Sequence, residues 1–182
     1  MPLTVYGRCV LVAVLLATVF LNACLAEAPA DPSTGDVDGT GAPEIIGLAN
    51  VIDGDSLEVD GISIRLSGVD TFESAQYCYR KNGTRWRCGH WGSVELDRLA
   101  GGEQVVCTPI DKDSYGRVVA RCLKGGTDLA RALVAGGWGL AYRKYSKDYT
   151  GEEDEARSRG RGVWSSDFEA PWEWRARIRS GK

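Results

Sequence analysis

The sequence has a single histidine, His90, and no pair of cysteines in a C-x-x-C arrangement. Structural zinc sites are usually built from such cysteine pairs, often together with histidines, so a zinc site is disfavoured. A lone histidine has no second ligand beside it and no visible partner for base catalysis. We therefore interpret His90 as a structural residue.

The chain also lacks an excess of positive charge. It carries 22 basic and 25 acidic residues, and one basic and four acidic residues precede Glu44, which leaves 21 of each in the remainder. Bulk attraction to nucleic acid is therefore not indicated, and any attraction to phosphate has to come from a local basic patch.

No apolar run is long enough for a confident membrane span. The longest, Val10–Leu21, follows Arg8, and we interpret residues 1–26 as an export signal. Two cleavage sites compete: ordinary cleavage after Ala26, or lipoprotein processing that makes a lipidated Cys24 the first residue and a membrane attachment. Residues 27–43 are rich in small and polar residues and are predicted to be a flexible linker. We expect an exported protein that is periplasmic, secreted or lipid-anchored to the cell envelope.

The cysteines agree with export. Either cleavage leaves four cysteines for the folded domain, an even number that suits two disulfides in an oxidising compartment. Four cysteines allow three connectivities, of which we favour Cys78–Cys88 and Cys107–Cys122. The first would close a polar loop, and the second would join two predicted strands on either side of a turn.

The stretch 51–74, VIDGDSLEVDGISIRLSGVDTFES, contains six carboxylates and one arginine. Polar and apolar residues alternate on both sides of Asp60-Gly61, a dipeptide preferred in two-residue hairpin turns. In this alternation Ile62, Ile64 and Leu66 share one face, and Arg65 lies on the other, between two acidic turns.

Acidic residues near an arginine allow two interpretations. One is a set of turn residues with a surface ion pair, worth at most about 1 kcal/mol. The other is a hard-cation site in which Asp55, Asp70 and Glu73 offer oxygens to Ca²⁺ or Mg²⁺ while Arg65 binds a phosphate oxygen.

A further motif, Asp113-Ser114-Tyr115-Gly116-Arg117, lies between the predicted strands 104–110 and 118–123. Together, IDGD, IRLSGVDTFE and DSYGR closely resemble the staphylococcal-nuclease (thermonuclease) family, whose motifs are D-G-D, R-L-x-x-x-D-[TA]-P-E and D-x-Y-G-R in this order. The resemblance extends over roughly residues 45–164.

The resemblance implies a fold and a set of site residues. The predicted fold class is α+β, a five-stranded OB-type β-barrel flanked by about three helices, in a domain of residues 44–176 followed by a basic tail, 177–182. We expect the three helices near residues 91–99, 128–136 and 152–159. By resemblance the catalytic residues are Arg65, Glu73 and Arg117, the Ca²⁺ ligands are Asp55, Asp70 and the carbonyl of Thr71, and Tyr115 and Tyr142 line a nucleotide pocket.

The implied activity is calcium-dependent hydrolysis of phosphodiester bonds in DNA or RNA to 3′-phosphate products. Glu73 would act as general base on the attacking water or order it, and Asp53 would support the site from behind. Two residues depart from the family pattern. Phe72 replaces a proline, which predicts looser placement of Glu73, and Ser114 replaces a frequently basic residue.

Two segments combine basic and aromatic residues, as single-stranded nucleic-acid sites do: the loop 75–87 and the tail from Pro171. For the loop the alternative is a solvated segment held by a disulfide, and for the tail we favour packing of Trp172 and Trp174 against the barrel. The alternative function is a non-catalytic OB-fold module that binds nucleic acid or protein, and a third is a secreted disulfide domain with a surface partner. Nothing in the sequence demands more than a monomer.

Overall fold

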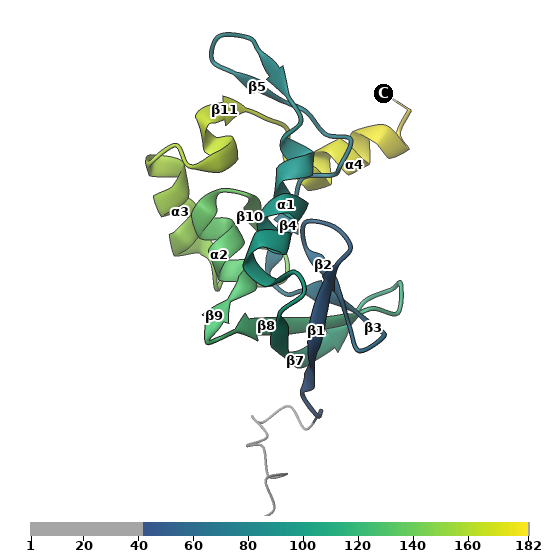
Figure 1. Cartoon of the computed structure of the whole chain (residues 1–182). Helices are drawn as coiled ribbons and strands as arrows, with labels where there is room; N and C mark the ends of the chain where they lie inside the picture. Colours follow the sequence, from purple (N-terminus) through teal and green to yellow (C-terminus); the bar gives the residue numbers. More distant parts are fainter. Residues whose placement is uncertain (1–41, 182) are drawn as a thin grey trace, which may run out of the picture. The chain divides into compact units, whose positions relative to one another are not determined.

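Five strands form the barrel that the family resemblance predicts. The computed structural model describes residues 42–181, all within one compact unit of the chain. The barrel strands are β1 (Ile45–Val51), β2 (Ser56–Val59), β3 (Ile62–Leu66), β7 (Gln104–Lys112) and β8 (Val118–Lys124). Antiparallel pairing runs β3-β2-β1-β7-β8, and a parallel pairing of β3 with β8 closes the barrel (Figure 1).

The turn between β2 and β3 has the predicted geometry. Asp60 has φ 51° and Gly61 has φ 74°, so both central residues adopt the left-handed conformation that a type I′ turn needs. This turn sets the register, in which Leu57 lies opposite Ile64 and Ser56 lies opposite Arg65. The predicted alternation of buried and polar residues is therefore confirmed.

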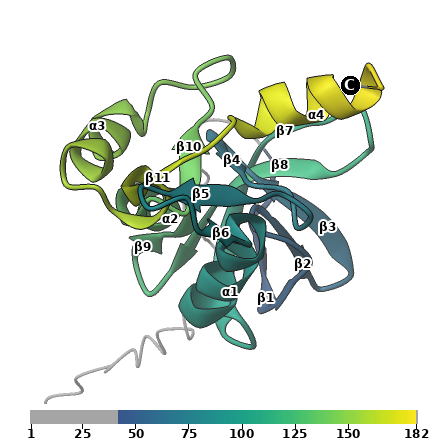
Figure 2. The ribbon, with the colours of Figure 1, turned by 90° about the horizontal axis from the view of Figure 1, so that it is seen from above.

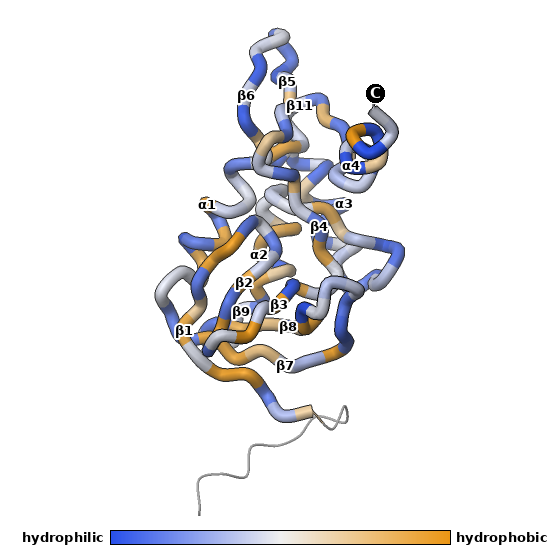
Figure 3. The backbone as a smooth tube through the Cα atoms, turned by 90° about the vertical axis from the view of Figure 1, so that its right-hand side faces the viewer, coloured by the Kyte–Doolittle hydropathy of each residue, from blue (hydrophilic) through white to orange (hydrophobic). Residues whose placement is uncertain are grey.

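Apolar residues of these strands fill the barrel. Leu57, Val59, Ile64, Leu66 and Val105 are each no more than 1% exposed. Figure 3 shows the apolar positions along the barrel strands, among them much of β7. Because side chains alternate across a strand, burial of Ile64 and Leu66 directs Arg65 to the outer face.

The three predicted helices are confirmed as α1 (Cys88–Ala100), α2 (Leu129–Gly136) and α3 (Thr150–Ser158). Asp128 caps α2 as expected, since its side chain accepts the Arg131 amide. A fourth helix, α4 (Pro171–Arg179), forms where the sequence indicated only a packing tail. Proline at its first position suits a helix start.

Among residues 42–181, no helix combines the length and apolar character needed to cross a bilayer.

A second layer of short strands joins the barrel to the C-terminal part. β4 (Val69–Thr71) pairs with β10 (Gly139–Ala141), and β9 (Thr127–Asp128) extends the sheet from β8. The segment 75–87, predicted as a loop, contains the hairpin of β5 (Cys78–Arg80) and β6 (Arg85–Trp86). Pairing of β5 with β11 (Ser166–Asp167), a contact distant in sequence, stabilises that hairpin.

Both favoured disulfides are confirmed. Cys78 is bonded to Cys88, and Cys107 is bonded to Cys122. Cys107 and Cys122 lie directly opposite each other on β7 and β8. Cys24, the predicted signal (1–26) and all but the last two residues of the predicted linker (27–43) lie outside the described residues.

Phe72 has a packing role that the sequence did not reveal. Its ring is 3% exposed and meets Phe168 edge-to-face at a centroid distance of 5.2 Å. It belongs to a second apolar cluster that lies apart from the barrel core, with Cys78, Cys88, Leu140 and Val163. The residue that replaces the family's proline therefore anchors the C-terminal layer.

Truncating this ring should destabilise the protein. We expect Phe72→Ala to lower the free energy of unfolding by about 3–5 kcal/mol, because it removes a buried aromatic ring and leaves a cavity. Denaturant unfolding followed by circular dichroism measures the change. Tyr115→Ala is the matched control, since Tyr115 is 86% exposed and its loss should change stability by no more than about 0.5 kcal/mol. Equal effects would contradict the packing role.

Candidate active site

Asp55 lies in the turn between β1 and β2 and is 4% exposed. Its Oδ2 accepts the Thr71 amide at 2.9 Å, and its Oδ1 accepts Arg65 at 3.0 Å. The Asp53 side chain accepts the Asp55 backbone amide at 3.0 Å and so shapes the turn, and Asp53 also lines the cavity beside Asp55. The motif thus directs one buried carboxylate toward β3 and β4.

Arg65 joins the two acidic turns. One guanidinium nitrogen donates to Asp55 at 3.0 Å, and the other donates to Asp70 Oδ1 at 2.9 Å. The side chain of Arg65 remains 20% exposed, so part of the fork faces solvent. The predicted meeting of Arg65 with these acids occurs, and the planar guanidinium is what allows one residue to bridge both.

A second arginine, which the sequence analysis did not place here, binds Asp70 and Glu73. Arg175 of α4 donates to Asp70 Oδ2 at 2.6 Å and Oδ1 at 3.1 Å, and to Glu73 Oε1 at 2.8 Å. Asp70 is 0% exposed between the two arginines. The only signal in the sequence was the run of arginines in the tail, which does not indicate a contact across more than a hundred residues.

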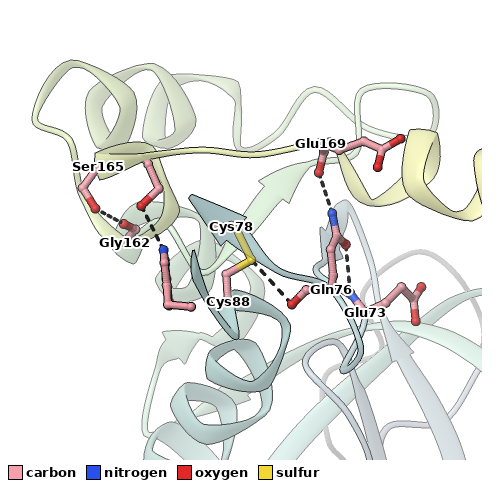
Figure 4. Close-up of a disulfide and its surroundings, with 9 residues drawn as sticks. Glu73, Gln76, Cys78, Cys88, Gly162, Ser165 and Glu169 are labelled. Carbon is pink, nitrogen blue, oxygen red and sulfur yellow. Dashed lines mark hydrogen bonds between the residues drawn. A yellow bond between two sulfur atoms is a disulfide. The ribbon is translucent and has the colours of Figure 1, made fainter. Parts of the chain in front are cut away.

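Glu73 is positioned through its main chain. The side chain of the fully buried Gln76 accepts the Glu73 amide at 3.2 Å and donates to the Glu169 carbonyl at 2.6 Å (Figure 4). The backbone N–H of Gln76 also donates to the backbone carbonyl of Glu73 at 2.7 Å. Gln76 therefore supplies the restraint that the missing proline was expected to provide, and it ties Glu73 to the segment that leads into α4.

Gly89, at the start of α1, packs against this same turn. A Cβ added at Gly89 would lie 1.6 Å from the carbonyl oxygen of Glu73, a backbone atom that cannot yield without moving the turn. The disulfide Cys78–Cys88 keeps α1 next to the segment that carries Gln76. The sequence analysis missed both Gln76 and Gly89, because their roles depend on this packing.

The close approach of Gly89 to the Glu73 carbonyl predicts that adding one methyl group at Gly89 lowers activity. We expect Gly89→Ala to lower kcat by about tenfold to a hundredfold, because a shift of about 1 Å in a catalytic group can have that effect. Steady-state cleavage kinetics on a labelled oligonucleotide measure the change. Gly151→Ala is the control, as a Cβ there meets nothing within 4 Å. Wild-type kcat in Gly89→Ala would show that the turn adjusts freely.

Arg117 reaches the site from the start of β8. It donates to Asp113 Oδ2 at 2.8 Å and to the hydroxyl of Ser56 at 3.0 Å, and Ser56 adjoins Asp55. The two tyrosines predicted to line a nucleotide pocket are not among the residues that line the cavity beside Asp55 and Glu73. Tyr115 is 86% exposed beside Arg117, and the face of Tyr142 stacks on Trp172 with ring centroids 5.7 Å apart.

A cavity of about 240 Å³ opens at the centre of this arrangement. Of the predicted site residues it is lined by Asp55, Arg65, Thr71 and Glu73, together with Arg175. Asp70 lies beneath the two arginines and Arg117 lies at the side, and neither forms part of the lining. His90, interpreted as structural, is exposed on α1 and also lies outside it.

The charges in the cavity influence one another. Burial raises the pKa of Asp55 to about 7, although the nearby charge of Arg65 acts in the opposite direction. Burial alone would lower the pKa of Arg175, but hydrogen bonds and charges from Asp70 and Glu73 raise that pKa above its ordinary value. The arginines thus stay charged and compensate the acids.

The donor chemistry fits a hard cation. Asp55, Asp70 and the Thr71 carbonyl offer oxygen only, which is the ligand type of Ca²⁺ and Mg²⁺. However, no three His, Cys, Asp or Glu side chains of residues 42–181 are grouped as a metal site. Both oxygens of Asp70 accept hydrogen bonds from Arg175, so this arginine occupies the carboxylate that would serve as a cation ligand.

Comparison with known proteins agrees with this geometry. Residues 63–166 match the family model described as "Staphylococcal nuclease homologue". The chain is 34% identical over 135 residues to "Succinoglycan biosynthesis protein ExoI" of Rhizobium meliloti, covering 72% of this chain and 71% of that protein.

Two further relatives carry nuclease names. Identity is 31% over 121 residues to "Staphylococcal-like nuclease CAN1" of Arabidopsis thaliana, covering 65% of this chain and 34% of the relative. The chain is also 30% identical over 116 residues to "Probable endonuclease LCL3" of Clavispora lusitaniae, which covers 57% of this chain and 48% of that relative. The chain thus spans half or less of the length of these two relatives.

Proposed function

The chain belongs to the staphylococcal nuclease family, and we propose that it is a calcium-dependent nuclease that hydrolyses phosphodiester bonds of DNA or RNA and leaves 3′-phosphates. One observation carries the proposal. Arg65 bridges Asp55 and Asp70 beside a cavity that Glu73 also lines, and Arg117 approaches through Ser56. A cleft with this set of charged groups is suited to phosphoryl chemistry.

Each side chain has a distinct part in the reaction. Glu73 takes the proton of the attacking water or orients that water, and Gln76 and Gly89 keep its main chain in place. Arg65 and Arg117 bind the non-bridging phosphate oxygens and bind them more strongly as negative charge develops. Asp55, Asp70 and the Thr71 carbonyl would hold Ca²⁺, which polarises the phosphate and water when bound.

The substrate is proposed to be single-stranded or locally melted. Arginines and aromatic rings lie together on the β5–β6 hairpin and just before it, where Arg85 lies 4.3 Å from the centre of the Tyr77 ring. Tyr77 and Tyr79 are 39% and 50% exposed, so their rings are accessible to bases. The predicted packing of Trp172 and Trp174 against the barrel is wrong in its partner, because Trp172 packs on the second apolar cluster and neither residue packs on the barrel core.

A second candidate function is a non-catalytic module. One relative is named for succinoglycan biosynthesis, and Arg175 covers two of the acids on which hydrolysis depends. In that case the chain would bind an oligonucleotide or another partner without cutting it. The two functions differ in one measurable property, which is product formation.

The test uses the purified chain and a 5′-labelled single-stranded DNA. We expect cleavage in Ca²⁺, loss of cleavage in EGTA, recovery on adding Ca²⁺ back, and products that end in 3′-phosphate. Glu95→Gln, which removes a carboxylate on α1 outside the cavity, should cleave normally. Binding without cleavage in any divalent metal would reject the nuclease and support the module.

We also propose that the protein is exported and acts as a monomer. The two disulfides support an oxidising compartment, since such bonds are rare in the cytosol. Mass spectrometry of the mature N-terminus in cell fractions tests the export signal and separates cleavage after Ala26 from lipidation at Cys24. An intact Met1 in the cytosolic fraction would reject both.

A further inference from the structure

The contacts of Arg175 conflict with the proposed chemistry. Asp70 is needed as a cation ligand and Glu73 as a base, yet the guanidinium of Arg175 binds both, at 2.6 Å and 2.8 Å. The arginine comes from α4, outside the region 63–166 that matches the family model. The contact therefore comes from a C-terminal segment beyond the matched region.

We propose that Arg175 is a gate: it and a divalent cation compete for Asp70, and binding of the cation expels Arg175 and releases the end of α4. The inference rests on the proposed function, because it assigns the cation to the same carboxylates. In the closed state Arg175 keeps Asp70 and Glu73 paired and lines the cavity beside them. In the open state Glu73 is free to act on water.

Coexistence of the cation with both arginines is unfavourable. Asp70 Oδ1 already accepts both Arg65 and Arg175, and Oδ2 accepts Arg175. A carboxylate has about four acceptor positions, so little capacity is left on a side chain that is 0% exposed. A doubly charged ion placed there would also be repelled by two guanidinium groups within a few ångströms.

Of the two arginines, Arg175 is the one that can leave. Arg65 is held in β3 between β2 and β8, where its backbone belongs to the closed barrel. Helix α4 is held at its start by the buried Pro171 and by Trp172 stacked on Tyr142, and further along by an ion pair of Arg177 with Glu169, which precedes the helix. Residues 176–181 are exposed, and Figure 2 shows the C-terminal part of α4 extending along the outside of the molecule.

This arrangement predicts that the closed state weakens cation binding. The apparent affinity of a site is reduced by the fraction of molecules in the competent state, so removing the gate should strengthen binding. Hydrogen bonds between charged groups are the stronger kind, and Arg175 makes three of them. We expect Arg175→Gln to bind Ca²⁺ about tenfold or more tightly than the wild type.

The experiment measures Ca²⁺ binding to the full chain by titration calorimetry, without substrate. The matched control is Arg179→Gln, which removes the same charge from the same helix at an exposed position. It should change the affinity by less than about twofold, because an exposed charge is screened by salt. Equal affinities in Arg175→Gln and Arg179→Gln would overturn the gate, and so would absence of Ca²⁺ binding in all variants.

A second measurement follows the helix itself. Hydrogen exchange of the peptide 171–181 in the wild type should accelerate when Ca²⁺ is added, because the docked helix opens. In Arg175→Gln the same peptide should exchange rapidly with or without Ca²⁺. Unchanged exchange of this peptide in the wild type at saturating Ca²⁺ would overturn the release of α4.

These readouts separate the gate from the nuclease. Neither calorimetry nor hydrogen exchange requires cleavage. If the wild type cuts no DNA but Arg175→Gln binds Ca²⁺ more tightly than the wild type, the gate is supported and the nuclease function is rejected. If the wild type cuts DNA in Ca²⁺ but Arg175→Gln and Arg179→Gln bind Ca²⁺ with equal affinity, the nuclease function is supported and the gate is rejected.

Discussion

Replacing Glu73 by glutamine is expected to lower kcat for DNA cleavage by about 10²–10⁴-fold, the usual contribution of general acid–base catalysis. Glutamine is close to glutamate in shape, so it can still occupy the mouth of the cavity, and its backbone keeps the bonds to Gln76. It cannot accept a proton from water. The loss should therefore lie in the chemical step rather than in binding.

Single-turnover cleavage with enzyme in excess tests this expectation, because it isolates chemistry from product release. Glu95→Gln provides the matched control, a carboxylate on α1 that pairs with Arg98 away from the cavity. The general-base assignment would fail if Glu73→Gln and Glu95→Gln cleaved at the same rate. A change in KM with unchanged kcat would instead give Glu73 a binding role.

Arg65→Lys should reduce kcat/KM by about 10²–10³-fold, as expected for loss of one donor to a developing negative charge. Lysine keeps the positive charge, so Asp55 and Asp70 are not left as unpaired buried acids. Its single ammonium group cannot reproduce the two bonds of 3.0 Å and 2.9 Å that Arg65 makes and also offer a planar edge to phosphate. Arg65→Lys therefore removes the planar two-donor geometry of the side chain and keeps its positive charge.

The measurement compares initial rates at several substrate concentrations with those of Arg121→Lys. Arg121 lies on the same barrel in β8, pairs with Asp148 and is 47% exposed, so the control makes the same chemical change outside the site. Full activity in Arg65→Lys would show that charge alone suffices. Thermal unfolding of both variants confirms that a lost rate does not reflect a lost fold.

In the site, the negative charges of the acids are compensated by the positive charges of two arginines. Asp55, Asp70 and Glu73 contribute negative charge, and Arg65 and Arg175 contribute positive charge at hydrogen-bond distance. A buried carboxylate without such a partner would be costly. This explains why the acids needed for a cation are covered by an arginine when the site is closed.

Much of the barrel was predictable because its signals are local. The Asp60-Gly61 turn needs two left-handed residues, and alternation on either side sets which face of β3 is buried. The Asp128 cap and the glycines after Val134 mark the limits of α2 in a similar way. The pairing of Cys107 with Cys122 follows from a hairpin with a tight turn, where the two residues become direct neighbours.

Other features depend on contacts that leave no local pattern. Closure of the barrel by β3 and β8 was expected only through the family resemblance, since periodicity describes a strand and not its partner. The segment 75–87 contains paired strands because β11 adds to β5 from the far end of the chain. Phe72 was interpreted only as a missing proline, and its role in packing depends on Phe168.

By itself the sequence determined the acidic turns, the arginine between them and the family, because each follows from neighbouring residues or from motifs in order. For the disulfides it favoured one of three connectivities, which the structure confirmed. Only the tertiary structure decided that Gln76 and Gly89 position Glu73, and that Arg175 occupies Asp70 and Glu73. The physical reason is the distance along the chain. Arg175 and Asp70 are 105 residues apart, and only the folding of α4 against the barrel brings the two charges together.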